Sequence, residues 1–301
     1  MINKVRVVNH LGESIELELR FPEKSGFLVR YIDGLGPSKA NVNMTELSTN
    51  DGAVYNSARV SSRNIVFNLL LLPDDSIEDT RQKLYRYFPI KKRIGIRITT
   101  DNRVCNTYGY VESNEVDIFS KEETTTISVM CPDSYFYSTL KTITVLSGVS
   151  ALFEFPFSNE SLTESLIEFD AISILNAQTM VYNGDANVGV MIYIHVLGLA
   201  EMITIYNTGT KEEMTIDTDR LETLTGTALS EGDEIIISTL TGSKTVTLLR
   251  EGEYINILSC VGKNSDWFQL AKGDNIFAFS ADTGTDNLQF RIENQTVYEG
   301  V

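Results

Sequence analysis

The sequence predicts a mainly β protein built from two β-sandwich domains, the first of which also packs one α-helix. Short segments that alternate apolar and polar residues recur along the chain, and this is the period of a half-buried strand. Glycine-containing turns separate these segments at even spacing in the second half, for example Asn183-Gly184-Asp185 and Glu231-Gly232-Asp233. Such spacing is typical of an antiparallel sandwich or jelly roll. Only one stretch, residues 75–88, has a clear helical period.

The charge of the chain changes near its middle, which predicts two domains. Residues 1–150 hold 18 Lys and Arg against 18 Asp and Glu, whereas residues 151–301 hold 7 against 23, so the whole net charge of −16 belongs to the second half. A length of 301 residues suits two domains of roughly 100–200 residues each. We place the domains at residues 1–145 and 146–301. The acidic second half is a poor ligand for nucleic acid, since phosphate contacts need Lys and Arg.

The first domain is predicted to form around residues 51–72. Asp51-Gly52 is a turn signal, and strands are expected at residues 54–60 and 64–72. The second strand carries apolar residues on both sides near its end, which predicts a central strand buried on both faces.

A helix is predicted directly after this strand, and it is expected to lie across it. Asp75 and Glu78 have the spacing of a capping box. Ile77, Leu84 and Phe88 fall on one helical face, and Pro89 ends the helix.

Other segments with the strand period complete the two sandwiches. In the first domain they are residues 15–19, 27–32, 93–98, 103–112, 115–119 and 124–131; in the second they are 165–169, 188–196, 202–207, 213–217, 234–238, 245–249, 267–270, 275–280 and 288–293. Residues 39–49 are polar with scattered apolar residues, which predicts a long hairpin or arm. Long polar insertions between strands are often interaction elements.

Residue types that carry catalysis or bind metals are sparse. His10 and His195 are the only histidines, and His195 lies in an apolar segment, which favours a hydrogen-bonded sheet residue over a ligand. The cysteines at 105, 131 and 260 have no metal-site spacing and are expected to be buried thiols, although Cys105 and Cys131 could pair if their strands are neighbours. No dinucleotide or Walker-type loop is present. We therefore expect no enzyme, no metal and no cofactor.

Charged and aromatic motifs leave alternatives open. Acidic pairs such as Asp217/Asp219 and Asp233/Glu234 could in principle hydrolyse a glycoside, but in so acidic a half chance pairs are expected, which favours solvated surface. Asp217/Asp219 and residues 282–286 could bind calcium, but neither fits a full calcium loop. The basic run at residues 91–93 favours a helix C-terminus over a nucleic-acid contact. Trp267 could stack on a sugar, but its alternating neighbours favour a place in the core.

The order of several motifs resembles the distal tail proteins of long-tailed bacteriophages. In the first half these are residues 51–65, the helix end Leu84-Tyr-Arg-Tyr-Phe88 and Cys131-Pro-Asp-Ser-Tyr-Phe136; in the second they are residues 183–189, 266–276 and 297–301. The resemblance spans nearly the whole chain and rests on the ordered set, since no single motif is specific.

The resemblance implies a structural protein of the virion tail tip, made in the cytoplasm of the bacterial host. The first domain would form a six-fold, tail-tube-like ring that joins the major tail tube protein to the tail-tip hub. The second domain would be a galectin-like sandwich that holds receptor-binding parts or, in rare cases, a host sugar. DNA would be passing cargo only, and no membrane contact is implied.

The ring requires a patch on one copy that meets a different patch on the next. The neutral charge of the first half suits such close contact between like copies. The candidate ring-interface residues, in the predicted arm and at strand edges, are Lys39, Asn41, Asn43, Glu46, Arg59 and Arg63. The alternative function is a carbohydrate-binding module that acts through the second domain, with Trp267 as the sugar contact.

Overall fold

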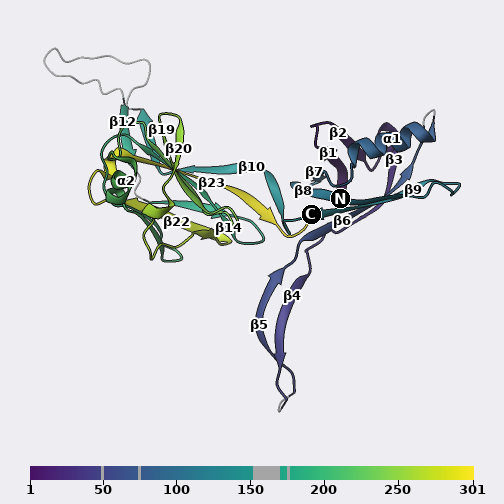
Figure 1. The fold of residues 1–301 in the computed structure, drawn as a ribbon, viewed down its shortest axis with the longest axis horizontal. Helices are drawn as coiled ribbons and strands as arrows, with labels where there is room; N and C mark the ends of the chain where they lie inside the picture. Colours follow the sequence, from purple (N-terminus) through teal and green to yellow (C-terminus); the bar gives the residue numbers. More distant parts are fainter. Residues whose placement is uncertain (49–50, 74–75, 152–169, 175–176) are drawn as a thin grey trace. The chain divides into compact units, whose positions relative to one another are not determined.

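A computed structural model describes residues 1–48, 51–73, 76–151, 170–174 and 177–301 (Figure 1). The chain divides into two compact units. Unit 1 comprises Met1–Leu140 and Val297–Val301, and unit 2 comprises Lys141–Thr296. The division differs from the sequence-based one, because the last five residues return to unit 1. No helix in the described part of the chain has the length and hydropathy that a membrane crossing requires.

Unit 1 is built mainly from strands. Its elements are β1 (Ile2–Val8), β2 (Ser14–Glu18), η1 (Pro22–Lys24), β3 (Phe27–Asp33), β4 (Ala40–Glu46), β5 (Ala53–Val60), β6 (Arg63–Leu71), α1 (Ile77–Tyr87), β7 (Arg93–Thr100), β8 (Val104–Val116), β9 (Thr124–Cys131) and the start of β10 (Phe136–Val145). The strands pair in the orders β2-β1-β7-β8-β10 and β3-β6-β9-β8. Strand β8 belongs to both rows, because its first part, up to Tyr110, pairs with β7, and its second part, from Tyr110 onward, pairs with β9. Only the first two residues of the predicted strand at 115–119 are strand, as the end of β8.

Strand β6 is central in its row, as predicted, since it pairs with β3 and β9. Its buried side chains are Ile65, Phe67, Leu69 and Leu71, each at most 3% exposed. The expectation that both faces are buried is wrong. Val66 and Leu70 on the other face are only half-buried, because no second layer of the described chain covers them fully.

Helix α1 packs on this strand, as the sequence predicted. The rings of Phe67 and Phe88 lie 5.6 Å apart between centroids, and Leu84 is fully buried in the same core. The helix has Ser76 at its N-cap position without a side-chain cap bond. Asp75 lies outside the described residues, so the capping box of Asp75 with Glu78 stays a prediction.

Unit 2 is a second β-sandwich. It contains the end of β10 and β11 (Ser147–Ala151), β12 (Asp170–Ile174), β13 (Ala177–Tyr182), β14 (Val188–Gly189), β15 (Met191–Val196), β16 (Ile203–Asn207), β17 (Glu212–Ile216), α2 (Thr218–Thr225), β18 (Glu234–Ser238), β19 (Thr245–Arg250), β20 (Glu253–Asn256), η2 (Leu258–Cys260), β21 (Gln269–Leu270), β22 (Gly273–Ser280), η3 (Thr285–Asn287) and most of β23 (Leu288–Tyr298). The predicted strand at 165–169 lies outside the described residues.

The two layers of unit 2 are the row β10-β23-β15-β18-β19-β20, to which β10 contributes its end, and the four-stranded row β13-β22-β16-β17. Aromatic rings join them. Phe279 of β22 stacks on Phe290 of β23 with centroids 3.9 Å apart. The prediction of a mainly β protein with sandwich architecture is confirmed, while the short helix α2 was not predicted.

Candidate assembly surface: the projecting hairpin

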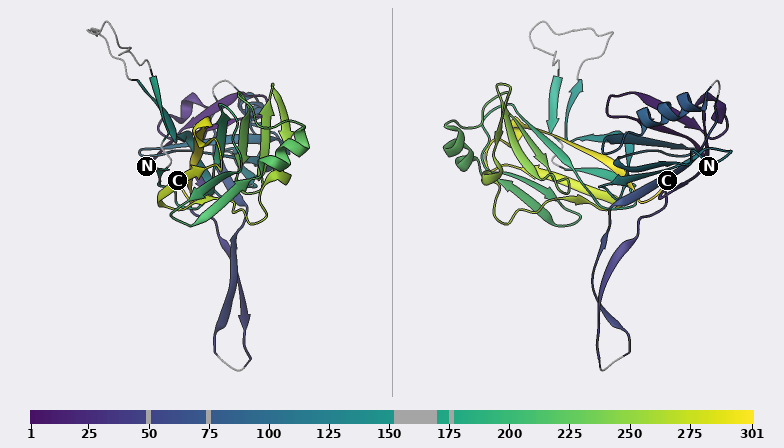
Figure 2. Two further views of the ribbon diagram at one scale, coloured as in Figure 1. Left: turned by 90° about the vertical axis from the view of Figure 1, so that its left-hand side faces the viewer. Right: turned by 45° about the vertical axis from the view of Figure 1, so that its right-hand side comes forward.

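Strands β4 and β5 form a two-stranded antiparallel ribbon that leaves the sandwich of unit 1 (Figures 1 and 2). Every residue of both strands is exposed. The predicted arm at residues 39–49 is therefore one strand of a longer hairpin. Its second strand is β5, which the sequence analysis had grouped with the core. An isolated two-stranded ribbon is marginally stable in water, so this element is unusual in standing alone.

The register of the hairpin separates its side chains into two faces. Val42 pairs with Ala58, and Met44 pairs with Tyr55 beyond a bulge between Asn43 and Met44. Because side chains alternate along a strand and paired residues share a face, the apolar residues collect on one side. We call this set the apolar arm face; it comprises Ala40, Val42, Met44, Tyr55, Ala58 and Val60.

The apolar arm face is open to solvent. Met44 is 57% exposed and Tyr55 is 62% exposed. The opposite face is mostly polar, with Asn41 beside Arg59 and Asn43 beside Ser57, and Val54 as its exception. A large exposed apolar surface rimmed by polar residues is typical of a protein contact site.

The candidate interface residues divide between exposed and buried positions. Lys39, Asn41, Asn43, Glu46 and Arg59 are all exposed at the arm, and whether they contact a partner stays a prediction. Most lie on the polar face, and Asn41 donates to the hydroxyl of Ser61 at 2.9 Å. The sequence analysis missed the apolar arm face, although the alternation of Val42 and Met44 within the arm was a usable signal.

Arg63 is the exception, and its assignment to an exposed interface is wrong. Its side chain is 2% exposed at the base of the arm. The guanidinium donates to the carbonyl oxygens of Gly34 and Gly36, both at 2.5 Å, and of Ser134 and Glu299, at 2.7 and 2.6 Å. It also lies 4.2 Å from the ring centroid of Phe136. Burial lowers the pKa of this guanidinium. Arg63 therefore fastens four segments of unit 1 together.

Serine side chains add to this anchor. The Ser134 hydroxyl donates to the Ser61 carbonyl at 2.5 Å, and the Ser38 hydroxyl donates to the Ser134 carbonyl at 3.3 Å. Ser38 and Ser61 flank the two strands of the arm. The base of the hairpin is thus fixed by hydrogen bonds, while the ribbon beyond it contacts solvent.

Two of the three cysteines, Cys131 and Cys260, are poor nucleophiles. All three are buried, and no disulfide joins them, so the alternative pairing of Cys105 with Cys131 is not observed. Burial raises the pKa of the Cys131 thiol to about 11 and also raises the pKa of Cys260. A thiol with a raised pKa is protonated at neutral pH and therefore unreactive.

The acidic pairs have structural partners. Asp217 caps α2, since its carboxylate accepts a hydrogen bond from the Arg220 amide at 3.0 Å. Asp233 is 2% exposed and pairs with Arg250 at 2.5 Å. Across the described residues, no group of three or more His, Cys, Asp or Glu side chains is placed to hold a metal ion.

The remaining motif residues lie at the surface or near it. Trp267 is half-buried, with the Lys244 ammonium 5.3 Å from its ring centroid, so the expectation of a core position is wrong; Phe268 is the buried residue. His195 lies exposed on β15. The basic run at 91–93 follows the end of α1 rather than forming it, and Arg93 begins β7.

Comparisons with known proteins agree with this architecture. Residues 197–293 match the family model of the siphovirus-type tail component, C-terminal domain. A search of curated proteins found no matching sequence. The Dit protein (gp 19.1) of phage SPP1, described as a paradigm of the hub adsorption apparatus in phages that infect Gram-positive hosts, has a similar fold. Its TM-score is 0.65 at 11% identity, and the match covers 97% of this chain and 98% of that one.

Two baseplate structures of phage P2 in its activated conformation, with Ca and with Sr, also match at 10% identity. Their TM-scores are 0.44 and 0.43, and the matches cover 98% and 97% of both chains. At these scores they add nothing to the fold assignment.

Residues 197–293 of this mainly β fold are therefore similar to one class of protein, the siphovirus-type tail components. Within that class, the resemblance to the distal tail proteins of siphophages, first indicated by the ordered sequence motifs, is confirmed.

Proposed function

We propose that this chain is a structural protein of a phage tail tip that assembles into a ring of six copies. In this role it joins the tail tube to the hub and presents receptor-binding parts. The similarity of residues 197–293 to siphovirus-type tail components supports the tail assignment. The observation that supports self-assembly is the apolar arm face, which is exposed over its whole length.

The arm suits assembly into a ring because a projecting ribbon makes a heterologous contact, in which two different surfaces meet. A projecting ribbon on one copy has to meet a different surface on the next copy, and repetition of such a contact closes into a ring when the rotation allows. Burial of the apolar arm face would stabilise the contact by roughly 25 cal/mol per Å² of apolar surface removed from water. The same burial would stabilise the hairpin itself.

The function is mechanical rather than catalytic in this proposal. Asp217 and the buried Asp233 are bonded to structural partners, and the thiols of Cys131 and Cys260 are protonated at neutral pH. The fold of the SPP1 Dit protein, a component of an adsorption apparatus, is similar over nearly the whole chain. Carbohydrate binding through Trp267 stays a prediction, and the Lys244 ammonium already lies over that ring.

The test compares two variants that add the same charge to opposite faces of the arm. Val42→Asp with Tyr55→Asp changes the apolar arm face, whereas Thr45→Asp with Ser57→Asp changes the polar face. We expect native mass spectrometry and electron microscopy to show six-fold rings for the wild type and the polar-face variant, and monomers for the apolar-face variant. All these residues are exposed, so the fold is expected to be retained and is checked by circular dichroism. A monomeric wild type, or rings in the apolar-face variant, would contradict the proposal.

A further inference from the structure

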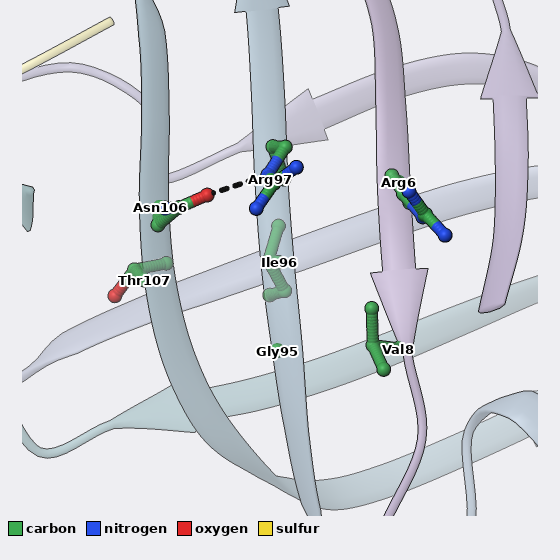
Figure 3. Close-up of a pocket in the computed structure, with 7 residues that line it drawn as sticks. All are labelled: Arg6, Val8, Gly95, Ile96, Arg97, Asn106 and Thr107. Carbon is green, nitrogen blue, oxygen red and sulfur yellow. Dashed lines mark hydrogen bonds between the residues drawn. The ribbon is translucent and has the colours of Figure 1, made fainter. Parts of the chain in front are cut away.

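A second surface of unit 1 has the properties of a binding site. A hollow of about 370 Å³ lies over strands β1, β7 and β8. Arg6 and Val8 of β1, Gly95 and Arg97 of β7, and Asn106 of β8 line it (Figure 3). We call it the arginine hollow.

The hollow exists because one strand position lacks a side chain. Gly95 pairs with Val8 on one side and with Tyr108 on the other. A Cβ added at Gly95 would meet only the Val8 side chain, at 3.9 Å, so the space above the glycine is open. Arg93 and Arg97 lie two residues before and after Gly95 and therefore share its face. The Arg93 guanidinium stacks 4.2 Å from the centroid of the Tyr108 ring.

The charges around the hollow are not balanced within it. Arg6 is directly opposite Arg97 in the antiparallel register, and like charges at such positions destabilise a sheet. Each has a neutral partner: Arg6 Nη2 donates to the Ser14 hydroxyl at 2.8 Å, and Arg97 Nε donates to Oδ1 of the Asn106 side chain at 2.9 Å.

Two further features of the arginine hollow favour the binding of an anion. The Nε atom of Arg6 is buried and has no hydrogen-bond partner. A buried donor without a partner costs free energy, and sites that bind a ligand often retain such groups. Glu16 is opposite Arg6 on β2, but its carboxylate is bonded to the Lys4 ammonium at 3.2 Å.

We propose that the arginine hollow binds a carboxylate side chain from a second copy of this chain. A carboxylate has four lone-pair sites, and an arginine presents a planar fork that matches its geometry. The acid would relieve the repulsion between Arg6 and Arg97 and accept from their unused donors. The absent side chain at Gly95 gives it room to approach the sheet.

A second copy is the occupant because of the charge of the chain itself. Residues 151–301 carry 23 Asp and Glu against 7 Lys and Arg, so each copy brings a strongly acidic half to any assembly. A basic hollow on unit 1 is complementary to that half. Complementary charges steer association and fix its register. The inference rests on the proposed self-assembly, but it concerns a surface distinct from the apolar arm face.

The experiment measures self-association by sedimentation at low and high chloride concentration. Arg6→Gln with Arg97→Gln removes the two charges, and Gly95→Val fills the hollow with a residue that strands favour. Arg20→Gln with Lys121→Gln is the control, since it removes two exposed positive charges elsewhere on unit 1. We expect the association constant to fall about tenfold or more in both hollow variants and to stay unchanged in the control. High chloride is expected to weaken the wild type more than the hollow variants.

The outcomes separate this inference from the proposed function. If the wild type assembles and both hollow variants assemble equally well, the inference is wrong and the ring proposal stands. If sulfate at matched ionic strength binds the hollow but does not weaken assembly, the site holds a small anion and the second copy is excluded. If the wild type stays monomeric, both proposals are wrong.

Discussion

At the scale of single residues, Arg63 shows how a buried charge is stabilised by backbone oxygens. Its four carbonyl partners come from residues between 34 and 299, so one side chain joins segments that are far apart in the sequence. A lysine could not replace it, because an ammonium group lacks the planar fork that reaches several acceptors at once. In the structure, Arg63 is the first residue of the buried series 63, 65, 67, 69 and 71 on β6.

A second residue-scale feature joins the β1–β2 turn to helix α1. The Glu13 carboxylate accepts hydrogen bonds from Arg86 and from the Asn9 amide at 3.0 Å. The Arg86 bond, with that of Asn9, lowers the pKa of Glu13 from 4.5 to about 2. A carboxyl group with a lowered folded-state pKa stabilises the fold above its unfolded pKa, and it loses this contribution as the pH falls.

The prediction concerns the acid side of the stability profile. Glu13→Gln should lower the free energy of unfolding at pH 7, and its difference from the wild type should shrink as the pH falls from 4.5 to about 2. Chemical denaturation at a series of pH values measures this. Glu23→Gln, at an exposed glutamate, is the control and should show a smaller difference. A Glu13→Gln difference that does not change with pH would contradict the assignment.

At the scale of elements, the hairpin β4–β5 and strand β6 show how neighbouring strands take different roles. Both β5 and β6 alternate, but β5 is exposed throughout, whereas β6 buries one face. The difference lies in their partners: among the described residues β5 pairs with β4 alone, while β6 lies between β3 and β9. The alternation of apolar and polar residues predicts that a segment is a strand, but it does not predict which strands pair with it.

Helix α2 gives an element-scale prediction. Asp217→Ala should destabilise unit 2 by about 1 kcal/mol, because it removes the N-cap bond to the Arg220 amide. Asp219→Ala, in the exposed first turn, removes only a favourable charge near the helix N-terminus and should cost a few tenths of a kcal/mol at most. Fluorescence of Trp267, the single tryptophan, reports unfolding of unit 2. Equal losses of stability in the two variants would show that negative charge near the helix N-terminus, and not the N-cap hydrogen bond, stabilises α2.

At the scale of the whole molecule, the chain passes between its two units twice, within β10 and within β23. The last five residues return to unit 1, where the Glu299 carbonyl accepts from Arg63 and the Val301 amide donates to the Leu35 carbonyl at 3.1 Å. Val297 is 2% exposed. Residues 297–301 therefore pack with residues 1–140 in unit 1.

A truncation after Thr296 tests whether residues 297–301 stabilise unit 1. It removes a carbonyl from the buried Arg63 and an apolar side chain from the interior, so unit 1 should unfold at a temperature lower by roughly 5–10 °C. Trp267 fluorescence should report an unchanged transition for unit 2, while circular dichroism should show the earlier transition of unit 1. A change confined to the Trp267 transition would show that residues 297–301 support unit 2 instead.

The sequence by itself determined the mainly β class, the helix on the strand at 63–71, the acidic character of the second half and the resemblance to distal tail proteins. These properties are local, because they depend on the period, the turn residues, the charge and the order of motifs along the chain. Only the tertiary structure decided that β5 leaves the core, that Arg63 is buried, that Trp267 is not, and that residues 297–301 complete unit 1. Each of these depends on contacts between segments distant in sequence, and the alternation of side chains along a strand is the same whether its partner is a core strand or a free arm.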